Sequence, residues 1–182
     1  MFFLAQVKKK KMQKKPAAGT TGKNLSTLLE LLNKKLNKYE LSREQITITN
    51  ALTEIEYKKE TNRTEASDEE IISIDNLRRL KSELINIENI IVCCGKKAML
   101  GICQVKCDLN KNCKVLYIKH LSTRGLIKIK NDMDGKEILS AEAQRRNGDS
   151  RSIKKIQNDN TLKRLEIICQ NIIKQLKNEK NL

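Results

Sequence analysis

Four short apolar runs, separated by segments with helical periodicity, most constrain what this chain can fold into. The runs are too short to be helices, and three of them are rich in β-branched residues, which is typical of buried strands. They are residues 2–6, 46–50, 90–94 and 115–119. The sequence therefore predicts four strands.

Helical patterns lie between and after these runs. Residues 24–38 place leucines on one stripe, and residues 160–176 show apolar side chains at helical spacing. A further helix begins after Ser67, because Ser67 and Glu70 have the spacing of a capping box. Alternation of strand and helix predicts right-handed crossovers and a parallel sheet covered on both faces.

The composition limits the class of protein. A chain of 182 residues with 38% hydrophobic and 3% aromatic residues is expected to form one domain with a core of Ile, Leu and Val. No apolar run approaches the roughly 20 residues that cross a bilayer, and the apolar start precedes its lysines, the reverse of a signal peptide. We expect a cytoplasmic protein that does not bind a membrane.

The six cysteines favour ordinary thiols. Cys93 and Cys94 lie inside an apolar run, where thiols pack as small hydrophobic groups. Cys103, Cys107 and Cys113 lack the CxxC pairs that are typical of structural zinc sites. We expect neither a metal nor another cofactor.

The positive charge is large and uneven. The chain has 37 Lys and Arg and 22 Asp and Glu, which gives a formal net charge of +15. The excess lies in a basic loop, residues 8–15, and in a basic C-terminal segment, residues 136–182, that ends in a helix. Two basic segments around a neutral body favour a surface for a polyanion, and a merely solvated surface is the alternative.

Ligand sites in open parallel sheets lie beyond the carboxyl ends of the strands. The residues at these positions are Gln6, Asn50, Gly95 and His120. Three of them are polar, and His120 is the one histidine of the chain. This convergence predicts a functional site at the strand ends.

These strand ends, read in order, resemble the motifs of the uracil-DNA glycosylase superfamily. The segments that carry the resemblance, in chain order, are residues 4–7, 15–23, 46–51, 62–64, 90–98 and 120–124. Among them, His120-Leu121-Ser122-Thr123-Arg124 is similar to a His-Pro-Ser-x-Leu motif, and Ile46-Thr47-Ile48-Thr49-Asn50-Ala51 to the strand whose terminal Asn reads uracil. The resemblance spans nearly the whole chain and implies one domain, residues 1–182. The implied fold class is an α/β three-layer sandwich with a central four-stranded parallel sheet.

The resemblance also implies a function, namely hydrolysis of the N-glycosidic bond of uracil or another modified base in DNA. His120 would stabilise the leaving base, Asn50 would recognise its edge, and Gln6 would position water. Ala17 stands at the base-stacking position. The implied partner is DNA, single-stranded or duplex with a flipped base, bound by a monomer.

The expected DNA contacts lie in two places. The loop formed by Gly19, Thr20, Gly22 and Lys23 leads into a helix N-terminus, where backbone N–H groups favour a phosphate; a tight turn with a cap is the alternative. Ser122 is expected to grip a phosphate, and Arg124 stands where the family places an apolar wedge.

Departures from the family pattern keep other interpretations open. Gln6 can orient water but cannot accept its proton, and Ala17 replaces a stacking aromatic. The alternative is a catalytically silent protein of the same fold that binds nucleic acid. A broader reading is a basic α/β nucleic-acid-binding protein in which the motifs are coincidental.

Overall fold

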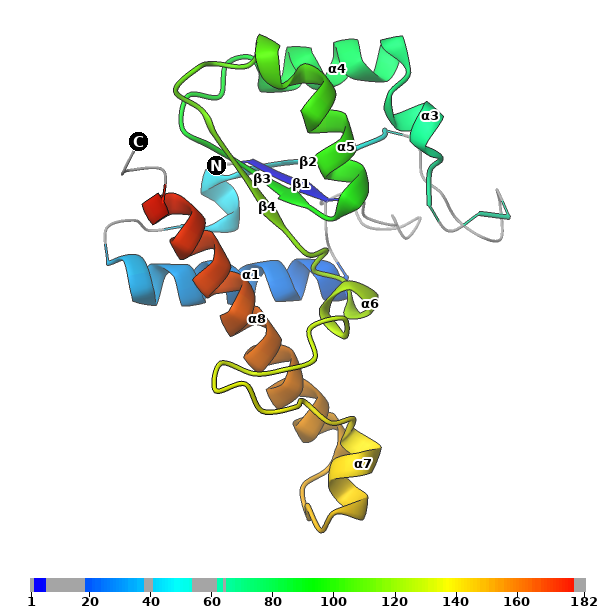
Figure 1. Ribbon diagram of the computed structural model, residues 1–182, viewed down its shortest axis with the longest axis vertical. Coiled ribbons are helices and arrows are strands. Elements are labelled where there is room, and N and C mark those ends of the chain that lie inside the picture. Colours follow the sequence, from blue (N-terminus) through cyan, green and yellow to red (C-terminus); the bar gives the residue numbers. More distant parts are fainter. Residues whose placement is uncertain (1, 6–18, 38–40, 54–61, 64, 179–182) are drawn as a thin grey trace.

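The computed structural model describes residues 2–5, 19–37, 41–53, 62–63 and 65–178 (Figure 1). The strands are β1 (Phe2–Ala5), β2 (Thr47–Thr49), β3 (Ile90–Cys94) and β4 (Lys114–Ile118). The α-helices are α1 (Thr20–Leu36), α3 (Asp68–Ile71), α4 (Ile74–Leu84), α5 (Lys96–Val105), α6 (Thr123–Leu126), α7 (Ala141–Arg146) and α8 (Ile153–Asn178). Two 3-10 turns are η1 (Arg43–Gln45) and η2 (Lys106–Asp108).

The strands pair in parallel, in the order β2-β1-β3-β4. In the longest ladder Ile90 lies opposite Lys114, and Cys94 lies opposite Ile118. Parallel pairing brings the carboxyl ends of the strands to one edge of the sheet, as the sequence predicted. The segments that follow β2, β3 and β4 therefore begin along that edge.

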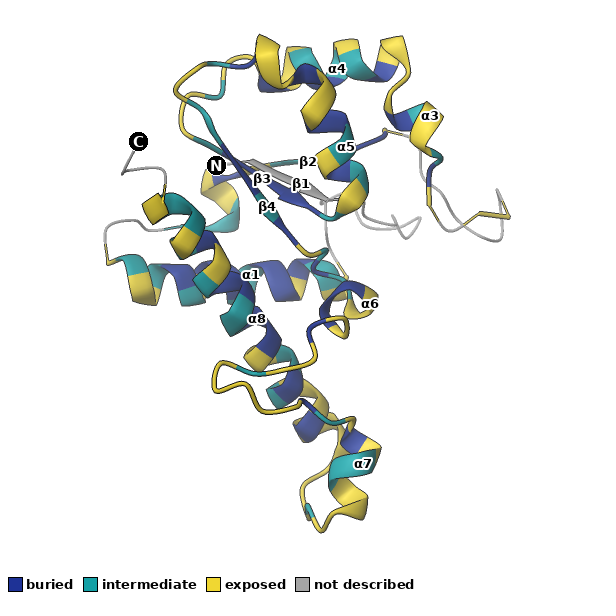
Figure 2. Ribbon diagram, in the orientation of Figure 1, coloured by how far each residue is buried: buried dark blue, intermediate teal, exposed yellow. Residues whose placement is uncertain are grey.

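Two apolar cores lie on opposite faces of β3 and β4 because side chains alternate along a strand. On one face Ile91 and Cys93 pack with residues of α4 and α5, such as Leu80 and Ile102. On the other face Val92 and Cys94 join the core that α1 and α8 complete with their own buried residues, including Leu28, Leu32, Ile168 and Ile172. Figure 2 shows the buried residues of these helices facing the strands.

The fold class differs from the sandwich predicted from the sequence. Helices, including the 3-10 turns, make up 55% of the described residues. Among strand residues whose burial is described, only those of β3 and β4 are buried, and β2 bonds to neither of these strands. The predicted three-layer sandwich is thus corrected to a mainly helical fold whose buried strand residues belong to β3 and β4, with β2 at the sheet edge and bonded only to β1. The physical reason is that β2 offers one apolar side chain, Ile48, between two threonines.

The helix predicted from Ser67 begins as expected but ends early. The capping box is confirmed, since the Glu70 N–H donates to Ser67 Oγ at 3.2 Å and the Ser67 N–H donates to the Glu70 carboxylate at 2.7 Å. The chain then leaves the helix, and Ser73, with φ −58° and ψ 145°, starts α4. The Ser73 hydroxyl donates to the Glu70 carbonyl at 3.0 Å, which stabilises the break.

The last helix is longer than the predicted 160–176. Its C-terminal half packs beneath the sheet, while its N-terminal half continues away from the sheet to α7 (Figure 1). Near its C-terminal end the Gln175 carboxamide accepts from the Tyr117 N–H and donates to the Tyr117 carbonyl, each at 3.0 Å. α8 is thereby attached to the outer edge of β4. No helix in the described part of the chain has the length and apolar character needed to cross a membrane.

Candidate functional site

Gly95 and His120 meet at the carboxyl ends of β3 and β4. Gly95 follows β3 with φ 94°, a conformation that L side chains rarely adopt, and its N–H donates to the Ile118 carbonyl at 2.9 Å. A Cβ added at Gly95 would lie 3.1 Å from the His120 Cβ. The structure therefore brings together two of the four strand-end residues that the sequence singled out.

The half-buried imidazole of His120 is held in one orientation. Its Nδ1 accepts a hydrogen bond of 3.1 Å from the Ser122 N–H. A nitrogen that accepts this bond carries no proton, so in the neutral ring the proton sits on Nε2. The backbone thus selects the tautomer in which Nε2 is a hydrogen-bond donor.

The turn after His120 depends on Ser122 and Gly125. The Ser122 hydroxyl accepts from the Gly125 N–H at 3.2 Å and caps α6. A Cβ on Gly125 would lie 1.9 Å from the His120 carbonyl oxygen, so a larger residue cannot occupy this place without moving the turn. Ser122, predicted to grip a phosphate, has a hydroxyl that also holds its own turn, whereas Arg124 is exposed on α6.

The start of α1 is joined to the same turn. The buried Asn24 side chain donates to the Leu121 carbonyl at 2.7 Å. The segment that we expected to be a loop is helical from Thr20, because the N–H groups of Gly22 and Lys23 already donate to the Gly19 carbonyl. Thr20 and Lys23 are exposed, Gly22 is buried, and the first turn of α1 carries no acidic residue. This helix terminus therefore keeps the partial positive charge that favours an anion.

Asn50 does not lie next to His120. It follows β2, and the strand order places β1 and β3 between β2 and β4. At a spacing of about 4.8 Å between neighbouring strands, the two backbones are separated by roughly 14 Å. The Asn50 carbonyl accepts from Arg79 at 3.0 Å, and Arg79 and Asn76 also donate to the Ala51 carbonyl, so α4 fixes the chain that follows β2.

Gln6, Ala17 and the basic loop 8–15 lie outside the described residues. Of the segments through which the beginning of the chain resembles the glycosylase pattern, residues 6–7 and 15–18 also lie outside the described residues. Nothing in the geometry therefore bears on the expected roles of Gln6 in positioning water and of Ala17 in contacting the base.

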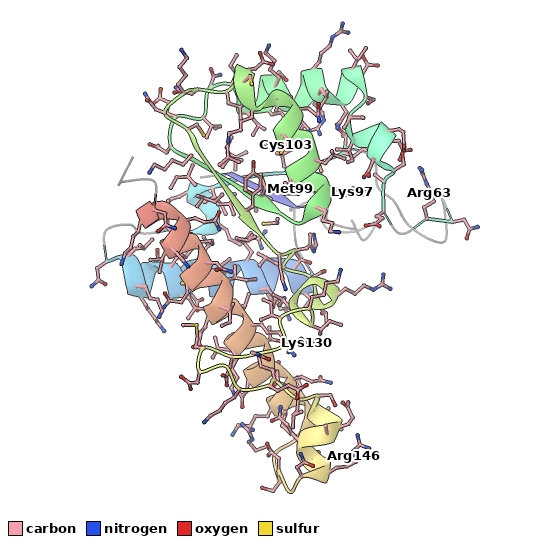
Figure 3. The ribbon with its side chains drawn as sticks, in the orientation of Figure 1. Arg63, Lys97, Met99, Cys103, Lys130 and Arg146 are labelled. Carbon is pink, nitrogen blue, oxygen red and sulfur yellow. The ribbon has the colours of Figure 1, made fainter. Side chains whose placement is uncertain are left out.

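The positive residues differ in how far acids neutralise them (Figure 3). Lys97, at the start of α5, pairs with Asp68 at 2.5 Å, and Arg63 pairs with Glu70 at 2.8 Å. In the basic C-terminal segment Arg151 bonds to Asp149 at 2.6 Å and also to Asp159. Apart from the buried Arg164, the other cations described there are exposed, and within the described residues Arg146 and the nearby Lys130 form no ion pair. Part of the predicted polyanion surface is therefore neutralised internally.

Cys93, Cys103 and Cys113 lie on the α5 face of the sheet, whereas Cys94 and Cys169 belong to the opposite core. Burial raises the pKa of Cys93 to about 12, and nearby Cys103 and Cys113 act in the same direction. The exposed Cys103 Sγ lies 3.9 Å from the Tyr117 hydroxyl. Among the described residues no group of three or more His, Cys, Asp or Glu is placed to hold a metal ion.

Sequence reasoning missed two residues that shape the site, Asn24 and Gly125. Asn24 was detectable as a polar residue on the leucine stripe of α1, four positions before Leu28. Gly125 stands three residues after Ser122, the spacing of a serine cap and the N–H that it receives. Comparison of the chain with protein-family models, curated proteins and solved structures found no match.

Proposed function

We propose that this protein is a DNA glycosylase that hydrolyses the N-glycosidic bond of uracil or another modified base. The observation that carries the proposal is the Ser122 N–H bond to His120 Nδ1, which makes Nε2 a donor at the carboxyl edge of the sheet. The motif resemblance at the strand ends supplies the reaction class, and the basic surroundings suit DNA as substrate.

The proposed reaction needs a donor at the departing base. As the bond between the sugar C1′ and the base nitrogen breaks, its electron pair stays on the base and the sugar becomes oxocarbenium-like. A neutral imidazole with its proton on Nε2 would donate to the base oxygen where negative charge develops. One preorganised donor of this kind is typically worth about 10²–10³ in rate. Water then adds to C1′ and loses a proton, which the departing base anion takes up, so that the products are the free base and an abasic sugar.

Asn50 would supply base recognition from the far side of the site. A carboxamide presents one donor and one acceptor, which matches the O4 and N3–H edge of uracil. The strand spacing separates the Asn50 and His120 backbones by roughly 14 Å, which leaves room for a flat ring between the two side chains. Gln6 would position the attacking water without accepting its proton.

The phosphates next to the flipped nucleotide would bind at the start of α1. Asn24 connects this helix start to the turn after His120, so a phosphate bound by the N–H groups there lies on the same side of the molecule as the imidazole. Lys23 and Arg124 are exposed and add positive charge. These phosphate contacts would hold the DNA while the base is extruded from the stack.

The second candidate function is nucleic-acid binding without catalysis. Gln6 cannot act as a base and Ala17 cannot stack on a ring, and the net charge of +15 favours binding without requiring chemistry. This candidate predicts salt-sensitive DNA binding without any abasic product.

Base release from labelled single-stranded DNA that contains uracil, followed by alkaline cleavage, separates the two candidates. We expect cleavage by the wild-type protein and a loss of about 10²–10³ in rate for His120→Ala. Thr123→Ala, which changes an exposed neighbour of the same turn, is the matched control and should retain full activity. No base release from uracil or from a panel of modified bases, together with intact DNA binding, would overturn the glycosylase in favour of the second candidate.

A further inference from the structure

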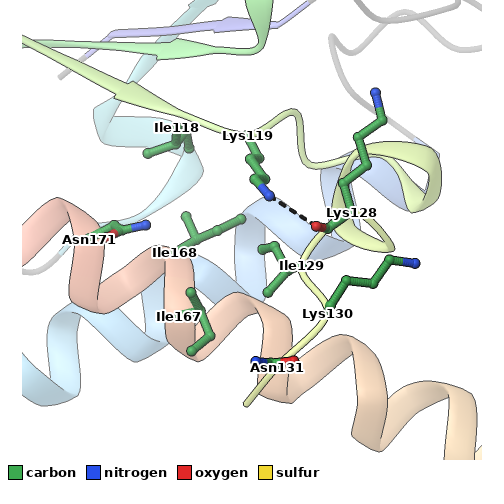
Figure 4. Close-up of a pocket in the computed structure, with 9 residues that line it drawn as sticks. All are labelled: Ile118, Lys119, Lys128, Ile129, Lys130, Asn131, Ile167, Ile168 and Asn171. Atoms are coloured by element: carbon green, nitrogen blue, oxygen red, sulfur yellow. Dashed lines mark hydrogen bonds between the residues drawn. The ribbon is translucent and has the colours of Figure 1, made fainter. Parts of the chain in front are cut away.

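An open pocket of about 300 Å³ lies immediately beside the turn that carries His120 (Figure 4). Its apolar floor and walls are the isoleucines 118, 129, 167 and 168, which come from β4, the segment after α6, and α8. Its remaining lining residues are Lys119, Lys128, Lys130, Asn131 and Asn171. The volume is at the lower end of small-molecule sites.

The polar part of the pocket is positively charged. Lys119 Nζ donates to the Lys128 carbonyl at 3.0 Å, so this ammonium group is held at the wall (Figure 4). An ammonium group has three N–H bonds, which leaves two for a ligand. No acidic residue is among the lining residues, and Asn131 and Asn171 add exposed carboxamides. The pocket therefore matches a ligand with an anionic group and an apolar, hydrogen-bonding ring.

The position of the pocket indicates how such a ligand arrives. Lys119 directly precedes His120, and consecutive Cα atoms are about 3.8 Å apart. Neighbouring nucleotides in a stacked strand are separated by about 3.4 Å, and by more once they unstack. The backbone positions of Lys119 and His120 are therefore separated by about one nucleotide step, a spacing that one strand can follow.

We propose that the pocket binds a second, unstacked nucleotide of single-stranded DNA, next to the nucleotide whose base is held at His120; this inference rests on the proposed function. The face of the base lies on the isoleucines, the carboxamides of Asn131 and Asn171 meet its edge, and the Lys119 ammonium group meets its phosphate. A paired nucleotide of a duplex cannot enter, because its base is stacked and hydrogen-bonded. The pocket thus selects single strands.

Binding of labelled oligothymidine, measured by fluorescence anisotropy, tests the pocket separately from catalysis. Ile167→Trp fills the pocket from its wall and should weaken binding about tenfold, the lower part of the range for loss of one base contact. Leu162→Trp, an exposed position on the same helix, is the size-matched control. Thermal unfolding checks that both variants fold.

A substitution that adds one negative charge at the surface provides a second variant that does not disturb packing. Asn171→Asp should weaken oligothymidine binding severalfold at low salt, with a smaller effect at high salt. Asn158→Asp makes the same change at an exposed position of α8 outside the pocket and should bind like wild type.

The outcomes distinguish this inference from the proposed function. Wild-type affinity for oligothymidine in both Ile167→Trp and Asn171→Asp would overturn the nucleotide pocket, even if His120-dependent base release is observed. Weakened binding in both variants would support the pocket, and absence of base release in the same preparations would overturn only the glycosylase activity.

Discussion

The side chain of Asn24 donates a hydrogen bond of 2.7 Å to the carbonyl of Leu121, 97 residues further along the chain. This bond joins the first turns of α1 to the turn after His120. Both groups are buried, so neither can exchange its partner for water without local opening. The helix start and the imidazole therefore keep a fixed relationship.

Asn24→Ala tests the stability that this bond provides. Removal of the donor leaves the Leu121 carbonyl without this partner, which we expect to lower the free energy of unfolding by about 1–3 kcal/mol. Urea unfolding followed by circular dichroism measures the change. Lys23→Ala, at an exposed neighbouring position, is the control. Equal stability of the two variants would contradict a structural role for Asn24.

Gly125→Ala should disturb the turn through steric overlap. A Cβ at this position lies 1.9 Å from the His120 carbonyl oxygen, and forced overpacking typically costs about 1–3 kcal/mol. We expect a lower unfolding temperature and a shifted His120 imidazole signal in NMR spectra. Gly19→Ala is the matched control, since no atom lies within 4 Å of a Cβ there. An unchanged imidazole signal in Gly125→Ala would disprove the predicted displacement.

The Ser122 N–H can be removed without changing the side-chain chemistry at His120. Ser122 has φ −69°, which proline adopts, so Ser122→Pro deletes the donor to Nδ1, whereas Ser122→Ala retains it. Both variants lose the serine cap, at a cost of about 1 kcal/mol. We expect NMR of the imidazole nitrogens to show the Nε2–H tautomer in Ser122→Ala and a mixture in Ser122→Pro. The same tautomer ratio in both would show that this bond does not select it.

The six thiols should differ in reactivity according to their burial. Thiolate is the reactive form, and Cys93 is both buried and held protonated, because burial raises its pKa to about 12. We expect a thiol reagent at neutral pH to label the exposed Cys103 and Cys107 first, and the buried Cys93, Cys94 and Cys169 only after denaturation. Peptide mass spectrometry over time assigns each label. Early labelling of Cys93 would contradict the described packing.

Acid should weaken the junction between α7 and α8. Hydrogen bonds from Arg151 lower the pKa of Asp149 from 3.8 to about 2. Ionised Asp149 therefore stabilises the folded state fully above about pH 3.8, and this contribution is lost as the pH falls through about 2. Unfolding temperatures between these pH values should fall less steeply for Asp149→Asn than for wild type. Arg151→Gln removes the hydrogen bonds that lower the pKa of Asp149 and should behave in the same way. If the unfolding temperature of both variants fell with pH as steeply as that of wild type, the Asp149–Arg151 interaction would not be a cause of the acid sensitivity.

The strands and the main helices were largely predictable because they depend on local patterns. The periods of apolar residues predicted all four strand segments and most of α1 and α8 to within a few residues. How far each strand is buried was not predictable, because the burial of a short run such as Thr47–Thr49 depends on what packs against it. The break at Ser73 was missed because the side chain competes for a backbone carbonyl only in the folded geometry.

The part of the site that was predictable is the part formed by residues at the strand ends. Parallel pairing alone brings Gly95 to His120. The hydrogen bond from Asn24 to Leu121 and the tight fit of Gly125 depend on how α1 and α6 dock, which no local pattern specifies. Asn50 was expected in the same site, but the strand order, which one sequence does not determine, places two strands between it and His120.

The two hydrogen bonds between Gln175 and Tyr117 also affect how copies of this chain meet. β4 is an outer strand, and outer strands present unpaired N–H and C=O groups on which another chain can build a sheet. The Gln175 carboxamide occupies one donor and one acceptor of that edge, as a neighbouring strand would. A strand from a second molecule would have to displace α8 before it could pair along β4, so this helix protects a highly apolar strand from edge-to-edge aggregation.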